Sequence, residues 1–362
     1  MSYASFEKLE SFMKDVFIKV GVPETDAAIC ADVLIESDKR GIDSHGIGRF
    51  KPIYIDRIKT GIQNPVTNFE IVKDHLATAV VDGHDGMGQV IAKKSMLIAI
   101  DKAKKYGLGM VVVRNSTHYG IAGYYVSMAA NENMIGITGT NARPSIAPTF
   151  GIENMLGTNP LTFGLPTDED FPFVLDCATS VSQRGKIEHY ERINKTMPEG
   201  WVINRDGTSE TDAAKALVGL NNDASALAPL GGLGEDTAGY KGYGYATVVE
   251  ILSAALQQGQ FLKALNGIDT NGKKNPFHLG HFFIAIDINA FVEPEKFKKT
   301  TGDILRELRA SQKAPGQERI YTAGEKEYLA WLQRKDTGVP LNDSLKKTLQ
   351  SLISEYQLDY QF

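Results

Sequence analysis

Five short apolar runs in the middle of the chain limit its fold more than any other feature. Each run has the length of a buried strand, and a helical pattern over 92–105 separates the first two. Strands that alternate with helices predict an α/β core in which helices cover a sheet. The runs occupy residues 77–81, 109–113, 135–138, 173–176 and 282–286.

Helices are predicted toward both ends of the chain. Apolar residues recur at three- and four-residue spacing from Leu9 to Val20, and the pattern stops at the Gly-Val-Pro sequence of 21–23. A second helix is expected to begin after an N-cap at Thr25 and to end near 40–41. Further helices are predicted over 243–257, 294–311, 325–335 and, with Asn342 as the N-cap, 342–356.

The balance of charges and apolar residues excludes several classes of protein. The 39 Lys and Arg residues stand against 44 Asp and Glu residues, so no positive surplus is available for phosphates and we expect no nucleic-acid partner. No apolar stretch reaches the ~18 residues that span a bilayer, and the N-terminal residues lack a signal-peptide core. Two cysteines, Cys30 and Cys177, are typical of a reduced compartment. We therefore expect a soluble, cytoplasmic protein that binds no membrane.

Two glycine-rich segments invite comparison with phosphate-binding loops. The first, 82–88, joins a predicted strand to a helix, but its order G-x-x-G-x-G differs from the G-x-G-x-x-G of a Rossmann fold. A tight turn explains these glycines better. The second, 239–244, opens a helix, so its backbone N–H groups and Lys241 are suited to meet a phosphate. Close packing of the helix start explains the second segment equally well.

Histidine motifs carry the candidate chemistry. His278 and His281 have the H-x-x-H spacing of some metal sites, but no third ligand accompanies them, and we predict a structural role. His45 lies between Ser44 and Arg49 in a polar segment punctuated by glycines. An arginine binds a carboxylate through two parallel hydrogen bonds, and a neutral imidazole exchanges a proton near neutral pH. This segment therefore has the groups that a small anionic substrate requires.

His118 occupies the second candidate position. It follows the apolar run 109–113 and precedes a predicted helix, which is where open α/β sheets bind ligands. For His45 and His118 alike, the residues leave two roles open: a catalytic acid or base, or a side chain that anchors a turn. The adjacent Asp43, Ser44 and His45 are not interpreted as a hydrolase triad, because neighbouring side chains rarely converge.

Ten motifs in order make the chain resemble a known family. It is similar to the malate/L-lactate dehydrogenase family of NAD(P)-dependent 2-hydroxy-acid oxidoreductases, which lack a Rossmann fold, over about 36–325. The motifs are DSHGIGR at 43–49, DGHDGMGQ at 82–89, STHYGIAGYY at 116–125, LGTNP at 156–160, LDCATS at 175–180, RGKI at 184–187, PEGW at 198–201, PLGG at 229–232, YKGYG at 240–244 and GHFFIAID at 280–287.

The resemblance implies both a fold and an assembly. The expected fold is α/β, with a three-layer core around a mixed, non-Rossmann β-sheet and a helical part built from both termini. The helical, substrate-side part is expected to comprise 1–75 and 290–362, and the NAD(P)-binding sheet core 76–289. The resemblance further implies a homodimer with its sites near the subunit interface, and NAD as the cofactor, with NADP as the alternative.

The same resemblance implies roles for individual residues. His45 matches the family's proton donor or acceptor, Ser44 its supporting hydroxyl, and Arg49 the anchor of the substrate carboxylate. His118 matches a second active-site histidine, which is the base in some members and part of the cofactor loop in others. No metal ligand is implied. The positions similar to cofactor contacts are His118, Tyr119, Gly120, Ile121, Ala122, Thr158, Asp176, Cys177, Ala178, Lys241, Gly242, Ala323, Gly324 and Glu325.

The expected reaction is the interconversion of a small 2-hydroxy acid and its 2-oxo acid, with malate and oxaloacetate as the leading pair. Lactate, sulfolactate, ureidoglycolate or a sugar-derived 2-oxo acid are alternatives on the same scaffold. Lys186 stands where some imino-acid reductases of the family carry an Asp, which argues against that activity. An inactive nucleotide-binding protein would have no reason to cluster Ser44, His45 and Arg49. A metal hydrolase would have to use His278 and His281.

Overall fold

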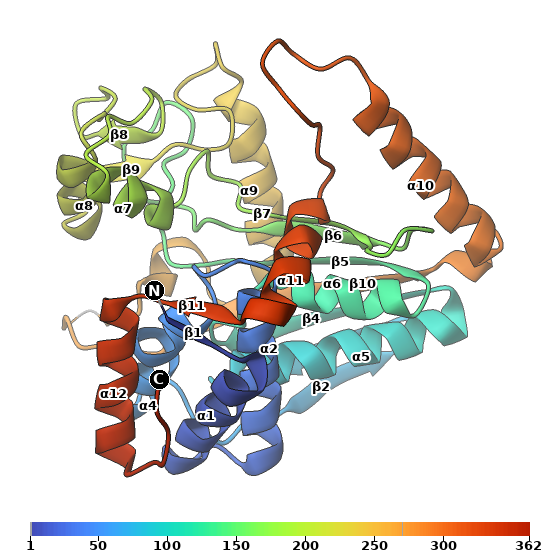
Figure 1. The fold of residues 1–362 in the computed structure, drawn as a ribbon, viewed down its shortest axis with the longest axis horizontal. Helices are drawn as coiled ribbons and strands as arrows, with labels where there is room; N and C mark the ends of the chain where they lie inside the picture. Colours follow the sequence, from blue (N-terminus) through green and yellow to red (C-terminus); the bar gives the residue numbers. More distant parts are fainter. Residues whose placement is uncertain (1, 270) are drawn as a thin grey trace.

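A mixed sheet forms the centre of the computed structural model, which describes residues 2–269 and 271–362 (Figure 1). Its seven strands lie in the order β2-β3-β4-β10-β5-β6-β7. The neighbours β3 and β4 are parallel, and each other neighbouring pair is antiparallel. The strands are β2 (Glu70–His75), β3 (Thr78–Asp82), β4 (Leu108–Ser116), β5 (Met134–Thr140), β6 (Leu161–Leu165), β7 (Phe173–Cys177) and β10 (Leu279–Asp287).

Helices cover both faces of this sheet. Side chains alternate between the two faces along each strand, so neighbouring residues of one strand contact different helices. In the central strand β10, Phe283 packs on the side of α5 (Gly88–Tyr106) and α6 (Ala122–Asn131). Its neighbour Phe282 packs on the opposite side, against α9 (Gly239–Ala254). The expected three-layer α/β core around a mixed sheet is therefore confirmed.

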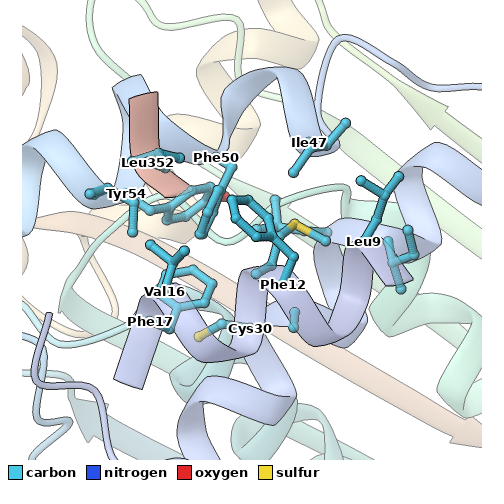
Figure 2. Close-up of a cluster of buried hydrophobic side chains, with 14 of the residues drawn as sticks. Leu9, Phe12, Val16, Phe17, Cys30, Ile47, Phe50, Tyr54 and Leu352 are labelled. Carbon is cyan, nitrogen blue, oxygen red and sulfur yellow. The ribbon is translucent and has the colours of Figure 1, made fainter. Parts of the chain in front are cut away.

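A separate apolar core joins the two ends of the chain. The strand β1 (Ser2–Ala4) pairs antiparallel with β11 (Val339–Leu341), and α1 (Phe6–Lys19), α2 (Glu24–Lys39) and α12 (Asp343–Tyr356) contribute buried residues to one cluster. Figure 2 shows part of this cluster, including Leu9, Phe12, Val16, Phe17, Cys30, Ile47, Phe50, Tyr54 and Leu352.

The helix α10 (Pro294–Ala310) lies apart from that core (Figure 1). Its Arg306 forms an ion pair with Asp168, which lies between β6 and β7. The C-terminal segment thus contributes to both parts of the molecule. The division of the chain at 75 and 290 stays a prediction.

Two predicted helix starts have different outcomes. The helix α2 begins at Glu24, directly after Pro23, and Thr25 lies inside its first turn, so the predicted N-cap at Thr25 is wrong. The predicted N-cap of α12 is confirmed, because the Asn342 side chain accepts a hydrogen bond of 2.8 Å from the backbone N–H of Leu345.

The glycine-rich turn before α5 is explained by close packing. A Cβ atom on Gly88 would lie 2.4 Å from the carbonyl oxygen of Thr117 and 2.5 Å from that of His118, so only glycine fits. The N–H of Gly88 also donates to the Thr117 hydroxyl at 3.0 Å, and the N–H of Met87 donates to Thr67. These donors are used inside the protein, as the tight-turn interpretation of 82–88 requires.

Some elements have no clear sequence signal. The edge strand β2 exposes all six of its residues, and β6 alternates small and large residues over only five positions.

Within the described residues, no helix has both the length and the apolar character needed to cross a membrane. The remaining α-helices and β-strands are α3 (Ile47–Arg49), α4 (Asp56–Lys59), α7 (Arg184–Arg192), β8 (Val202–Asn204), α8 (Ala213–Asn221), β9 (Ser225–Leu227) and α11 (Glu325–Thr337).

Candidate active site

The loop after β4 holds His118 in a fixed position. The buried Thr117 hydroxyl donates to the carbonyl oxygen of Gly86 at 2.7 Å and accepts from Gly88. The ring of Tyr119 stacks on His281 with centroids 4.5 Å apart and an interplanar angle of 2°. These contacts tie the His118 loop to the central strand and to the start of α5.

The polar segment after α2 is held by two aspartates. The buried Asp38 carboxyl accepts a hydrogen bond of 2.7 Å from the N–H of Ile47. A Cβ atom on Gly46 would lie 2.1 Å from that carboxyl, so this position requires glycine. Asp43 forms an ion pair with Arg334 of α11. Asp43 therefore has a structural partner, and it is not the third member of a triad.

Within this segment, Ser44 and His45 interact although they are neighbours. The Ser44 hydroxyl lies 2.9 Å from His45 Nδ1, whereas the prediction was that adjacent side chains rarely converge. The Nε–H of Arg49 donates to the carbonyl oxygen of Ser44 at 2.9 Å. The fork formed by the two terminal nitrogens of Arg49 has no protein partner within the described residues, so it is available for a carboxylate.

The structure brings His45 and His118 together. Their rings are nearly parallel, at 20°, with centroids 5.9 Å apart. Tyr54 completes the group, because its hydroxyl lies 2.6 Å from His118 Nδ1. The N–H of Gly120 lies 3.3 Å from the same nitrogen and donates to it.

Tyr54 was not predicted from the sequence. It lies in a π-helical turn, η1 (Phe50–Ile55), and packs edge-on against Phe17 with ring centroids 6.2 Å apart. Figure 2 shows Tyr54 and Phe50 within the apolar cluster of the helical part. Turns of this type are frequent at functional sites, but they leave no periodic sequence pattern.

Burial and nearby positive charge keep both histidines neutral. Desolvation, helped by the Arg49 guanidinium, lowers the pKa of His45 to about 4. Desolvation and the neighbouring His45, Arg57 and Arg49 hold the pKa of His118 well below its usual value. Burial raises the pKa of the Tyr54 hydroxyl, which therefore keeps its proton.

Several of the predicted cofactor residues line one cavity of about 550 Å³. Its volume lies within the usual range of small-molecule sites. α2, α6, β7 and α11 all contribute to the lining. The predicted residues found there are Ile121, Asp176, Ala323 and Gly324.

Asp176 and Glu325 already have partners within the protein. The Asp176 carboxylate accepts hydrogen bonds from the N–H of Gly123 at 2.7 Å and from Thr162. The buried Glu325 carboxylate forms an ion pair with Arg319 and accepts from the N–H of Thr322 at 3.0 Å. Glu325 thus stabilises the turn that carries Ala323 and Gly324, which is a structural function whether or not the cofactor contacts it.

A second group of predicted cofactor residues lies outside that cavity. The Thr158 carbonyl oxygen accepts from the N–H of Thr179, whose own carbonyl accepts from Leu230. A Cβ atom on Gly242 would lie 2.2 Å from the carbonyl oxygen of Leu230, so the start of α9 is packed closely. Lys241 is exposed next to it, and the role of its ammonium group toward a phosphate stays a prediction.

The two histidines of the H-x-x-H motif have separate partners. His278 lies 2.9 Å from Asp85, and the fully buried His281 bonds to the Thr140 hydroxyl at 2.7 Å. Among the described residues, no group of three or more potential ligands is arranged to hold a metal ion. Lys186, at the relay position, extends over the ring of Trp201.

The comparisons with known proteins agree over nearly the whole chain. The family model described as malate/L-lactate dehydrogenase matches residues 4–350. The malate dehydrogenase of Pyrococcus horikoshii is 44% identical over 346 residues, covering 96% of this chain and 92% of its own. The L-sulfolactate dehydrogenase of Methanocaldococcus jannaschii is 42% identical over 356 residues, covering 98% and 97%. The solved malate dehydrogenase of Entamoeba histolytica is 45% identical, with a TM-score of 0.96 over 100% of this chain and 99% of its own.

The buried Asp38 gives a test of how the His45 segment is held. Burial raises the pKa of the Asp38 carboxyl to about 8, so the folded protein binds a proton that the unfolded protein releases near pH 4. Stability should therefore fall as pH rises from about 4 to 8. Asp38→Asn keeps an oxygen for the N–H of Ile47 but does not titrate. Urea unfolding should show that wild-type stability, relative to Asp38→Asn, decreases from pH 5 to pH 8. A constant difference across this range would contradict the buried, protonated carboxyl.

Proposed function

The chain belongs to the malate/L-lactate dehydrogenase family of pyridine-nucleotide-dependent 2-hydroxy-acid dehydrogenases, and we propose that it interconverts malate and oxaloacetate. One observation carries this proposal. Two neutral histidines lie side by side next to the free guanidinium fork of Arg49. This combination binds a carboxylate and moves the proton of the hydroxyl on the neighbouring carbon, which is what oxidation of a 2-hydroxy acid requires.

The hydrogen bonds around His118 support its role as a hydrogen-bond donor to the substrate. A backbone N–H can only donate, and the protonated Tyr54 hydroxyl lies 2.6 Å from the same nitrogen, so both act on the lone pair of Nδ1. In the neutral ring the proton is then on Nε2. We propose that this Nε2–H donates to the substrate oxygen and stabilises negative charge there.

His45 is better suited to move the proton. The Ser44 hydroxyl can accept a hydrogen bond from His45 Nδ1–H, which leaves Nε2 with a free lone pair. In this proposal Arg49 binds the carboxylate, and His45 Nε2 takes the hydroxyl proton during oxidation and returns it during reduction. Positioned proton transfer of this kind contributes about 10²–10⁴-fold to the rate.

The cavity bordered by Ile121, Asp176, Ala323 and Gly324 supports a site for the cofactor. When a nicotinamide dinucleotide is bound, its ring accepts the hydride from the substrate or gives it back. More acidic than basic side chains line the cavity, and this charge disfavours an additional 2′-phosphate. We therefore propose NAD rather than NADP. The acidic side chains are Glu36, Asp170, Asp176 and Glu327, against Arg40 and Lys326.

L-Sulfolactate is a second candidate substrate, because a relative of that name matches almost the entire chain. Malate and sulfolactate share a 2-hydroxy carboxylate and differ in the second acidic group.

We also propose a cytoplasmic location, which is supported by the free thiols of Cys30 and Cys177.

A panel of 2-oxo acids tests the proposed reaction. Oxaloacetate, pyruvate and sulfopyruvate are each incubated with the enzyme and NADH or NADPH, and loss of the reduced cofactor is followed by absorbance. Oxaloacetate with NADH should give the highest kcat/KM. If no 2-oxo acid is reduced with either cofactor, the dehydrogenase proposal fails. If only sulfopyruvate is reduced, the class of reaction stands and malate is the wrong substrate.

A change at His45 tests which histidine moves the proton. His45→Gln should lower kcat for malate oxidation by about 10²–10⁴-fold, while the Kd for NADH stays within a few-fold. In the wild type, kcat/KM for malate should be independent of pH above about 5 and should fall as pH drops through about 4, where His45 becomes protonated. The exposed His75 offers a matched control, His75→Gln. A near-normal kcat for His45→Gln would assign the proton transfer to another group.

The homodimer remains part of the proposal and is supported by α9. This helix exposes Tyr245, Val248 and Ile251 on its outer side, each about half accessible, and such apolar surfaces mark interaction sites. Sedimentation equilibrium should give twice the chain mass of 39.6 kDa. Ile251→Asp should weaken the dimer, whereas Leu97→Asp on α5, at the opposite face of the sheet, should not. A wild-type monomer at micromolar concentration would contradict the proposed assembly.

A further inference from the structure

Arg57 is a charged residue near the site that the reaction described above does not use. It lies in α4, three residues after Tyr54, and its guanidinium stacks over the ring of Phe277 at 4.4 Å from the centroid. The side chain is partly buried. Within the described residues it forms neither an ion pair nor a hydrogen bond. A guanidinium that is withdrawn from water without a partner is costly to keep in a fold.

Two other arginines near the site also lack carboxylate partners. Arg49 and Arg143 form no ion pair within the part of the chain that the structure describes. By contrast, Arg114 and Arg309, elsewhere in the fold, each contact an aspartate or glutamate, and Arg334 pairs with Asp43 of the His45 segment. The chain has 44 acidic residues and a net charge of −5. A cluster of arginines without protein carboxylates is therefore a local excess of positive charge in an acidic protein.

Arg57 is close enough to the catalytic group to affect it. Tyr54 contacts His118 directly, and Arg57 follows Tyr54 by three residues, in the turn of α4 that continues from η1. The guanidinium of Arg57 helps to lower the pKa of His118, as that of Arg49 does. Burial lowers the pKa of Arg57, and the guanidinium of Arg143 lowers it further. An anion between these groups would relieve their mutual repulsion.

We propose that Arg57 binds the second acidic group of the substrate, with Arg143 contributing charge. Arg49 holds the carboxylate next to the reacting carbon, and the guanidinium of Arg57 holds the carboxylate or sulfonate at the other end of the molecule. The enzyme is then selective for 2-hydroxy diacids, and it discriminates against monoacids such as lactate because they leave Arg57 unpaired. This inference rests on the proposed function and specifies its class of substrate.

A purely structural role for Arg57 makes a different prediction. If the guanidinium only packs on Phe277, its loss disturbs every substrate alike, because each one uses the same His118 and Tyr54. If it binds the second acidic group, its loss affects diacids alone. The ratio of kcat/KM for a diacid to kcat/KM for a monoacid separates the two roles.

The test compares oxaloacetate with pyruvate in Arg57→Met, which retains an unbranched side chain against Phe277 but has no charge. The value of kcat/KM for oxaloacetate should fall about tenfold to hundredfold, and that for pyruvate should change by less than about threefold. Arg57→Lys should recover part of the loss, because it keeps the charge without the fork. The exposed Arg192 of α7, changed to Met, is the matched control and should leave both values unaltered.

Two outcomes would overturn the inference. One is an equal loss for both acids in Arg57→Met, which would indicate packing alone. The other is a loss for neither acid.

A binding measurement keeps this test separate from the proposed reaction. Succinate and butyrate have the same four-carbon chain and differ by one carboxylate. Calorimetry should show tighter binding of succinate than of butyrate to the wild-type protein, and Arg57→Met should remove that preference. Equal binding of the two acids to the wild type would overturn the anion subsite even if 2-oxo acids are reduced. A retained preference for succinate without turnover would support the subsite and contradict only the proposed reaction.

Discussion

The hydrogen bond between Tyr54 and His118 connects the two parts of the molecule on which the site depends. Tyr54 belongs to the apolar core formed by both ends of the chain, where it packs with Phe17 and Phe50. His118 belongs to the loop at the end of β4, which the central strand and the start of α5 hold in position. The site therefore exists only where the helical part meets the sheet. Its precision depends on aromatic packing that lies outside the catalytic group itself.

Burial and positive charge at this junction determine the chemistry. They keep His45 and His118 neutral in the absence of substrate, so His45 is ready to accept a proton. A bound anion reverses part of this effect, because its negative charge favours the protonated imidazole and moves the pKa of His45 back toward neutrality. In the proposed mechanism, the same base then returns the proton in the reducing direction. In this proposal, anion binding and proton transfer are coupled through the charges around Arg49 and Arg57.

The sequence was sufficient for the layers of the fold and for the main candidate residues. The apolar runs predicted five of the strands in the central sheet, and the motifs containing His45 and His118 pointed to two loops that the structure brings together. It was insufficient where no periodic pattern exists. β2 consists of exposed residues at the edge of the sheet, and Tyr54 lies in an irregular turn. Asp38 looks like an ordinary polar residue of a helix, and only the packing of Gly46 against it reveals its function.

The protonation of the two imidazole rings tests this account most directly. Nitrogen-15 NMR of the histidine side chains reports which ring nitrogen carries a proton. Between pH 6 and pH 8, both rings should be neutral in the free protein, with the proton on Nε2 in His118 and on Nδ1 in His45. A His118 ring that carries its proton on Nδ1, or a cationic ring for either residue at neutral pH, would contradict the assignment of donor and base.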